Sequence, residues 1–585
     1  MGFTKDIFQS SLLGAAIALV NSCNNEFLEQ ISGKVSRRFL FLVKEIWVRY
    51  SNQKGCLSAS KHDLAETIFR LSMNQVNYMP YMPELIKRSM FGNDPSDFEN
   101  FILNYWENSP FLLRNGSRND GVIFNCLDFS SRTIDAAMDS ILQSLVSCPH
   151  ITSDELDILT FLDEVKGVLG SPMVYGQDIR VVKTQELLPG STNENVKKEV
   201  HFFNCTSLTS VNGLAFTCNH IQNCKEAVQD GFTIALRGME FRSKKIAGLS
   251  DGLAALFGQP LVGANVYLTP PNSQGLSRHY DDHCVFVCQL LGMKRWVVFP
   301  RSAPLLPRLY EPLDSLSPLE FAAKFSEGRE FFLREGDILY IPRGCPHEAY
   351  TTVNERESQV EGSSFSLHLT LGIEVEPPFE WEGFAHVALH CWNQKLKEEY
   401  FLVDSTSISN FMIINSLHIA IRLIGDHDPA FRKACMVAAS MQSDDGRVDQ
   451  MQNVSLMQRS IFCNIINSID VQSNFMEAFK KIEDLVHEKD DISLQWLRWI
   501  RHLPQEGNEI EKFDFDILLQ AFDEFLLLTR GNIKAVETIF MQVKCQFCRS
   551  VTFEDVRESF ESLLKKYKKV RRQYMNGMLS LHSAP

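Results

Sequence analysis

The sequence lacks a long apolar run, a dense cysteine pattern and an excess of positive charge. Its most apolar segment is SLLGAAIALV (Ser11–Val20), about half as long as the roughly 20 residues that an apolar helix needs to cross a bilayer. We therefore expect no membrane anchor and interpret this segment as a buried helix. The 15 cysteines are scattered between Cys23 and Cys548. This spacing argues against a secreted disulfide framework and favours a reducing intracellular compartment, which also keeps iron ferrous.

The formal net charge is -14, from 58 Lys and Arg against 72 Asp and Glu. This balance argues against broad affinity for the nucleic-acid backbone, so direct nucleic-acid binding is expected to be weak. A basic protein partner fits better. One basic cluster, KKYKKVRRQ (Lys565–Gln573), has three interpretations: a nuclear-import patch, a nucleic-acid contact or a solvated helix end.

The 585 residues exceed the size of one hydrophobic core and predict several domains. Apolar residues at three- and four-residue spacings predict helices toward both ends of the chain. Short β-branched and aromatic runs broken by Gly, Pro and Asn predict an antiparallel barrel or sandwich between them. The expected divisions are a helical region at 1–88, a strand-rich domain at 89–376, a helical region at 377–450 and a further helical domain at 451–585.

Two predicted strands have one polar and one apolar face. They are ANVYLTPP, where Asn265, Tyr267 and Thr269 share a face, and SFSLHLTLG, where Ser366, His368 and Thr370 do. For either strand alone, a sheet with one face in water is the simpler account. Because a candidate metal motif accompanies them, we favour a barrel whose interior is a polar site.

A double turn follows in REGDILYIPRGCPHEAYT (Arg334–Thr351). Glu335-Gly336-Asp337 predicts a first turn, 338–341 a strand, and Pro342-Arg343-Gly344 a second turn. His347 is then expected to begin the next strand. Two rigid turns of this kind can aim one histidine into a barrel.

The stretch SRHYDDHCVF (Ser277–Phe286) holds two histidines and two aspartates. On a strand, His279, Asp281 and His283 would share a face, and Asp282 would point the other way. The local pattern therefore leaves the ligand choice open. Two histidines and one carboxylate, with coordination positions left open, suit a mononuclear Fe(II) oxygenase. The set His279, Asp281 and His347 meets this requirement, with His283 expected to pack nearby.

The predicted strands and the candidate metal motif lie in three segments, NVYLTPPNSQGLSRHYDDHCVFVCQLLGMKRWVVF, GDILYIPRGCPHEA and SLHLTLG. Together these segments resemble the JmjC/cupin-type 2-oxoglutarate Fe(II) oxygenases, most closely the ribosomal-oxygenase branch of histidyl hydroxylases and lysine demethylases. The resemblance implies an α+β fold, in which a double-stranded β-helix (jelly-roll or cupin) JmjC barrel at 89–376 is flanked by helical domains. It also implies Fe(II) as cofactor, 2-oxoglutarate as co-substrate and dioxygen.

The resemblance further implies a role for each residue of the site. His279, Asp281 and His347 would be the iron ligands, and Lys294 would pair with the distal carboxylate of 2-oxoglutarate. Asn265 and Tyr267 would line the co-substrate pocket, with Thr269, His368 and Thr370 as further pocket positions. Without the resemblance, a solvated hairpin lysine is the simpler interpretation of Lys294.

The sequence departs from the family at two places. Gly372 stands where relatives carry a serine that touches the co-substrate, so one hydrogen bond is expected either to be missing or to come from Thr370 or His368. The segment NERESQVEGSS (Asn354–Ser364) is longer than the usual connection and is expected to reshape the substrate entrance.

The expected activity is hydroxylation of a histidine in a basic substrate such as a ribosomal protein. Demethylation of a histone methyl-lysine by the same iron site is one alternative, and a catalytically weakened scaffold is another. By resemblance, 377–450 would form a dimerisation region and 451–585 a winged-helix-like domain. A chromatin regulator in the nucleus or nucleolus is implied, and the cytoplasm is left open.

Overall fold

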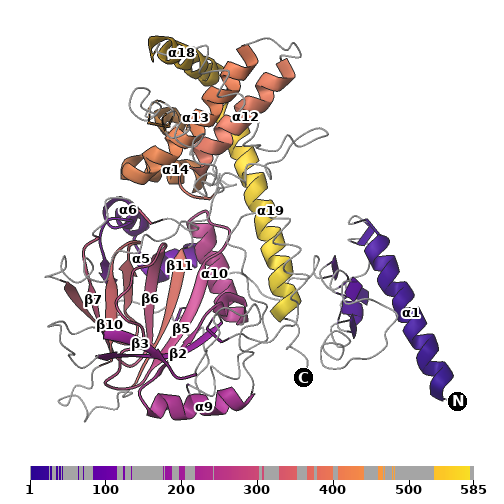
Figure 1. The fold of residues 1–585 in the computed structure, drawn as a ribbon, viewed down its shortest axis with the longest axis vertical. Helices are drawn as coiled ribbons and strands as arrows, with labels where there is room; N and C mark the ends of the chain where they lie inside the picture. The colour runs from indigo at the N-terminus through magenta and orange to yellow at the C-terminus, as the bar shows by residue number, and fades with distance from the viewer. Residues whose placement is uncertain are drawn as a thin grey trace.

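The computed structural model describes a set of helices and strands separated by gaps (Figure 1). The main described ranges are 2–24, 83–114, 178–186, 197–203, 218–301 without 242, 328–351, 365–373, 379–399, 406–440, 459–467 without 466, and 533–579, with scattered residues elsewhere. The helices are α1 (Gly2–Ser22), α5 (Pro83–Phe91), α6 (Pro95–Asn104), α9 (Cys218–Gln229), η1 (Met239–Phe241), α10 (Lys244–Leu256), α12 (Gly383–Glu399), α13 (Thr406–His427), α14 (Pro429–Ser440), α18 (Ile533–Ser550) and α19 (Phe553–Leu579).

The strands form two antiparallel sheets. The larger sheet has the order β1-β9-β6-β11-β5-β4-β2-β3, and the smaller has the order β10-β7-β8. The strands are β1 (Phe111–Leu113), β2 (Ile179–Glu186), β3 (Lys197–His201), β4 (Thr233–Leu236), β5 (Gly263–Thr269), β6 (Cys284–Leu291), β7 (Lys294–Val298), β8 (Arg329–Leu333), β9 (Ile338–Ile341), β10 (His347–Tyr350) and β11 (Ser366–Ile373). Sequentially distant strands lie side by side, as in a jelly roll.

The two sheets enclose one small apolar core. Val285 and Val287 of β6 share it with Trp296 and Val298 of β7 and with Leu333 of β8. The opposite face of the larger sheet packs against helices: Phe286 of β6 lies 5.7 Å, centroid to centroid, from both Phe91 of α5 and Phe101 of α6. Alternate residues of β6 thus face two different cores, as a strand period of two requires.

The double turn predicted around β9 is confirmed. Gly336 (φ 92°) precedes the strand and Gly344 (φ 77°) follows it, both in the left-handed region that glycine tolerates. A Cβ on Gly344 would also lie 2.9 Å from Cδ of Pro307. β10 then begins at His347, as expected.

A cluster of buried, charged side chains joins the barrel to helix α14, in the helical part of the chain that follows β11. Glu107 accepts from Nε of Arg343, in the turn after β9, at 2.7 Å, and from Nε of Arg432, on α14, at 2.7 Å. All three side chains are buried, and Glu107 has a positive φ of 52°. Burial opposes ionisation of Glu107, yet the two guanidinium groups hold its pKa below the ordinary value.

Helix α19 runs from the helical part down beside the barrel (Figure 1). It packs against α12 and η1, and its Phe560 and Tyr567 contact Phe379 at centroid distances of 5.8 and 5.6 Å. The whole basic cluster Lys565–Gln573 therefore belongs to a helix whose apolar side is packed. Helix α5 also crosses the boundary at residue 88 expected from the sequence.

The apolar segment Ser11–Val20 is helical as expected, but the interpretation of a buried helix is wrong. Leu12 and Leu19 are each 63% exposed, because only one side of α1 contacts other described residues. No helix in the described part of the chain has both the length and the apolar character needed to span a membrane.

Candidate metal centre

The segment that carries His279 and Asp281 is extended but is not a strand. His279 forms an isolated two-way bridge with His347, with N–O distances of 3.2 and 2.7 Å. The carbonyl of Asp281 accepts from the amide of Gly344 at 2.8 Å. The chain then bends at Asp282, and β6 begins only at Cys284. The strand alternation expected for this segment is therefore wrong, since backbone bonds to the second turn set its course.

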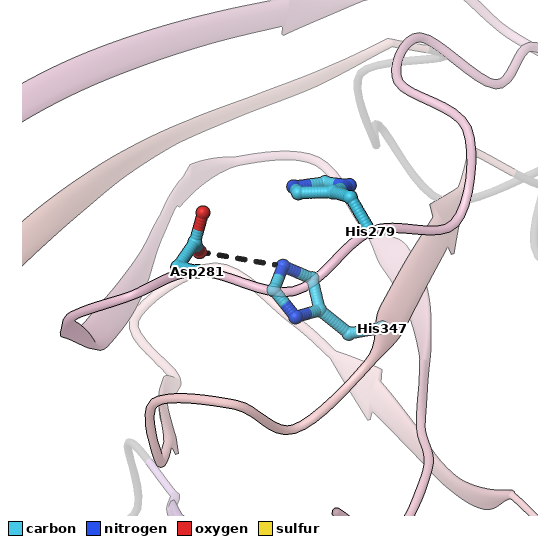
Figure 2. Close-up of side chains that lie close together, drawn as sticks. All are labelled: His279, Asp281 and His347. Carbon is cyan, nitrogen blue, oxygen red and sulfur yellow. Dashed lines mark ion pairs between the residues drawn. The ribbon is translucent and has the colours of Figure 1, made fainter. Parts of the chain in front are cut away.

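Three side chains converge at this point. His279, Asp281 and His347 each offer a ligand atom, and these atoms lie within 4.8 Å of one another, in the one such group found among the described residues. Nε2 of His347 lies 3.7 Å from Oδ2 of Asp281, and the imidazole centroids are 4.5 Å apart. Figure 2 shows the three side chains facing a common centre.

Backbone carbonyls orient both imidazoles. Nδ1 of His279 lies 2.8 Å from the carbonyl of Ser277, and Nδ1 of His347 lies 3.0 Å from that of Cys345. When Nδ1 donates to a carbonyl, the lone pair is on Nε2, which is the usual arrangement for a histidine that binds a metal. Each ring is thus held in the tautomer that a metal ligand needs.

The charge state of the cluster also suits a cation. Burial, together with the neighbouring His279, lowers the pKa of His347 to about 4, so this imidazole is neutral near pH 7. Burial opposes ionisation of Asp281, but His283, His279, His347 and Arg237 hold its pKa below the ordinary value. A carboxylate beside the neutral imidazole of His347 belongs to the donor set of an open transition-metal site.

Lys294 lies inside the barrel. It is 5% exposed, and its Nζ donates to Oγ1 of Thr269 at 2.8 Å. Oγ1 of Thr269 also lies 3.2 Å from that of Thr233. Burial lowers the pKa of Lys294 to about 7. The solvated hairpin lysine is therefore excluded, and a buried amine is available to an anion.

The polar faces of β5 and β11 point into the barrel. His368 stacks on Tyr267 at 4.8 Å and meets Trp296 of the opposite sheet edge-on at 5.4 Å. Asn265 and Thr370 are paired across the two strands. Burial raises the pKa of Tyr267 to about 12, so its hydroxyl stays protonated. The alternative of a half-solvated sheet is therefore wrong for these strands.

Several interior polar atoms have no hydrogen-bond partner among the described residues. They are Nδ1 of His368, Nε1 of Trp296 and Oε1 of Gln289. A buried polar atom without a partner is costly, so these atoms indicate that the interior accommodates a polar ligand. The expected co-substrate, a small dicarboxylate, fits this interior together with Lys294.

The sequence pattern did not identify Trp296 or Gln289 as interior residues. The strand period of two could have identified Trp296, because it follows the inward-facing Lys294 by two residues on the same strand. Gln289 lies opposite His368 in the neighbouring strand and so shares its face of the sheet. Arg278 was also missed; it pairs with Glu348 at 2.9 Å and lies over the ring of Phe299 at 3.9 Å, next to both histidines. The long connection at 354–364 lies outside the described residues.

Residues 240–371 match the sequence profile of a JmjC domain. This part of the chain is therefore similar to a JmjC domain, and the predicted α+β class, with a JmjC-type barrel and helical flanks, is confirmed.

Curated relatives match parts of the chain. It is 38% identical over 155 residues to the Drosophila grimshawi bifunctional lysine-specific demethylase and histidyl-hydroxylase NO66, covering 25% of this chain and 18% of the relative. It is 28% identical over 279 residues to rat ribosomal oxygenase 2, covering 47% of this chain and 45% of the relative. The chain thus spans less than half the length of these relatives.

Solved structures of a bacterial protein are also similar. The Escherichia coli ribosomal oxygenase YcfD aligns with a TM-score of 0.26 at 16% identity, covering 61% of this chain and 73% of that one. YcfD in complex with cobalt and 2-oxoglutarate aligns with a TM-score of 0.25 at 15% identity, covering 71% and 73%.

Proposed function

We propose that this protein is an Fe(II)- and 2-oxoglutarate-dependent dioxygenase that hydroxylates a histidine of a protein substrate. The observation that carries the proposal is the convergence of His279, Asp281 and His347 at one end of a barrel whose interior holds the buried amine of Lys294. A metal site and a carboxylate-binding amine in one cavity match the needs of this chemistry.

In this proposal His279, Asp281 and His347 hold Fe(II). Three protein ligands leave positions open for a chelating co-substrate and for dioxygen. When bound together, these groups supply the oxidant that hydroxylates a C–H bond, while 2-oxoglutarate is converted to succinate and carbon dioxide. The protein contributes orientation and the exclusion of water.

The other interior residues bind and orient the co-substrate. Lys294 pairs with its distal carboxylate through a charge-assisted hydrogen bond. Thr269 holds Nζ of Lys294 in place. Asn265 and Tyr267 line the same pocket, with His368 and Thr370 beside them on β11. The protonated hydroxyl of Tyr267 and the unpartnered Nδ1 of His368 are suited to direct hydrogen bonds.

The substrate is a basic protein in this proposal. The net charge of -14 favours such a partner. The relatives are named as ribosomal oxygenases and as a bifunctional demethylase and histidyl-hydroxylase. These names support a histidine of a ribosomal protein as the target, and the demethylation of a histone methyl-lysine is the second candidate, because one iron site serves both reactions.

Further parts of the proposal concern organisation and location. We propose that 377–450 contributes to dimerisation, that 451–585 forms a winged-helix-like domain, and that the protein acts as a chromatin regulator in the nucleus or nucleolus. The names of the relatives and the basic cluster Lys565–Arg572 support this location.

Anaerobic titration with Fe(II) and 2-oxoglutarate tests the proposal. We expect a metal-to-ligand charge-transfer band, and succinate when oxygen and ribosomal proteins are supplied. Mass spectrometry of those proteins should then show a histidine heavier by one oxygen atom, whereas demethylation would release formaldehyde from a methylated histone. A protein that shows neither the band nor succinate is instead a catalytically weakened scaffold.

A further inference from the structure

The backbone bridge between His279 and His347 carries a second pair of residues on its outer side. Because the bridge is antiparallel, the next residues that lie opposite each other are Arg278 and Glu348. Neighbouring residues of an extended chain point to opposite sides, so these two side chains lie behind the bridge while the two imidazoles face the proposed metal. The imidazoles and the charged pair thus occupy the two sides of one short backbone contact.

The smaller sheet shows the same two sides. On its inner face, the ring of Trp296 lies 5.8 Å, centroid to centroid, from that of His347. Glu348 is opposite Val297 on β7. The residues on either side of Val297, Trp296 and Val298, belong to the core between the sheets. Glu348 is therefore on the outer face of the smaller sheet, away from the proposed metal.

Arg278 is held on two sides. Its Nη2 donates to Oε1 of Glu348 at 2.9 Å, and its guanidinium carbon lies 3.9 Å from the ring centroid of Phe299. The amide of Phe299 donates in turn to the carbonyl of Pro346, the residue before His347, at 2.8 Å. The side chain of Glu348 is 7% exposed and that of Arg278 is 28% exposed. Salt screens an ion pair this sheltered much less than it screens an exposed pair.

The segment that carries His279 needs such an attachment, because it belongs to no strand of either sheet. Among the described residues, backbone hydrogen bonds tie this segment to the other ligand through the bridge to His347, and to the second turn through the bond from Gly344 to Asp281. A metal ligand that is already ordered loses less conformational freedom when the metal binds. Contacts that order this segment should therefore raise metal affinity.

We propose that Arg278 and Glu348 are positioning residues for the metal ligands. Their ion pair fastens the segment that carries His279 to the strand that begins at His347. Neither side chain is a ligand in this proposal; they fix the spacing of the two imidazoles from behind. The inference rests on the proposed function, because it concerns the same metal site.

Metal affinity tests this role without any substrate. Mn(II) is titrated into the metal-free full chain and its variants. We expect Arg278→Gln and Glu348→Gln each to raise the Mn(II) dissociation constant about tenfold, as the loss of a residue that orients a metal ligand does. The double variant should lose little more than either single variant, because both changes break the same pair. Additive losses, or single variants that bind Mn(II) as tightly as the unmodified protein, would overturn the inference.

Two further variants separate positioning from a loss of stability. Arg278→Lys keeps the positive charge beside Glu348 and should bind Mn(II) within about threefold of the unmodified protein. Arg114→Gln removes an ion pair with Asp337, in the turn at the other end of β9 from Gly344, and should leave Mn(II) affinity unchanged. Each titration is made well below the variant's midpoint of thermal unfolding. A pair that only stabilises the fold would lower that midpoint in Arg278→Gln and leave the dissociation constant unchanged.

The outcomes also separate this inference from the proposed function. If the unmodified protein binds Mn(II) and 2-oxoglutarate and Arg278→Gln binds Mn(II) equally well, the positioning role is refuted and the proposed function stands. If the unmodified protein does not bind Mn(II), both are refuted.

Discussion

The substitution Lys294→Met should make the metal-free protein more stable while strongly weakening its affinity for 2-oxoglutarate. Methionine keeps the length and apolar stem of the lysine but removes the buried ammonium group. In the folded protein the pKa of Lys294 is about 7, against an ordinary value of 10.5. The folded state therefore binds fewer protons than the unfolded state between these two pH values.

The magnitude follows from this difference in pKa. Stability rises with pH between about 7 and 10.5, and below that window the buried charge opposes folding in full. At pH 7.5 the penalty is about 4 kcal/mol, at about 1.4 kcal/mol per pH unit. Methionine also forfeits the hydrogen bond from Nζ to Thr269, worth about 1 to 2 kcal/mol. The net gain in unfolding free energy is about 2 kcal/mol at about pH 7.5 and should vanish near about pH 9.5. Above about pH 10.5 the variant should be about 1 to 2 kcal/mol less stable than the unmodified protein, because only the lost hydrogen bond remains.

The loss of binding should be larger than the gain in stability. A buried carboxylate left without its cation costs about 3 kcal/mol or more, which corresponds to a dissociation constant raised about 100-fold. Urea unfolding of the metal-free protein at several pH values measures the first effect, and anaerobic calorimetry of 2-oxoglutarate binding to the Mn(II) form measures the second.

Arg295→Met is the matched control. Arg295 is the next residue along β7 and faces outward, where it pairs with the exposed Glu330. Its substitution should change the unfolding free energy by less than about 1 kcal/mol and leave binding unchanged. If Lys294→Met is less stable than the unmodified protein at pH 7.5, or binds 2-oxoglutarate normally, the buried-cation argument is refuted.

His279→Ala should lower Mn(II) affinity at least about tenfold, because it removes a proposed metal donor. The matched variant His283→Ala removes no donor and should lower this affinity by less than about threefold. Equal losses for the two variants in a metal titration would contradict the assignment. His418, whose Nδ1 lies 2.8 Å from that of His386, has a pKa far below the ordinary value because of burial and neighbouring histidines. Its folded pKa is depressed, so stability should fall as pH drops below about 6.5, by about 1.4 kcal/mol per unit. Acid unfolding of His418→Gln should show a shallower dependence, and an identical slope would refute this. Glu107→Gln should lower the unfolding free energy by about 3 kcal/mol or more, because two buried guanidinium groups lose their shared carboxylate; an unchanged urea midpoint would contradict it.

Local sequence patterns were sufficient to predict the strands and turns around the candidate metal centre. Alternation with period two identified the inner faces of β5 and β11, because a strand leaves each side chain only two directions. Gly336 and Gly344 marked both turns, because their backbone lies in the left-handed region. The convergence of His347 with His279 was expected from chemistry and resemblance, not from local sequence.

Long-range contacts determined what the sequence did not predict. The path of residues 277–283 depends on backbone bonds to Gly344 and His347, which are more than 60 positions away along the chain. The burial of Lys294 depends on the contact between β7 of the smaller sheet and Thr269 on β5 of the larger sheet, which the sequence around Lys294 alone does not predict. The contact between His283 and Gly372 likewise joins the segment before β6 to β11, two segments that only the fold brings together.

The cluster of Glu107, Arg343 and Arg432 has a consequence for how this chain can be divided in the laboratory. Arg432 belongs to the helical part, Glu107 to the segment before the first barrel strand, and Arg343 to the turn that delivers His347. A fragment ending after β11 would retain Glu107 with only one of its two cations, directly behind that turn. The barrel expressed alone is therefore expected to fold poorly. Fragments meant to retain the metal site should extend at least through α14.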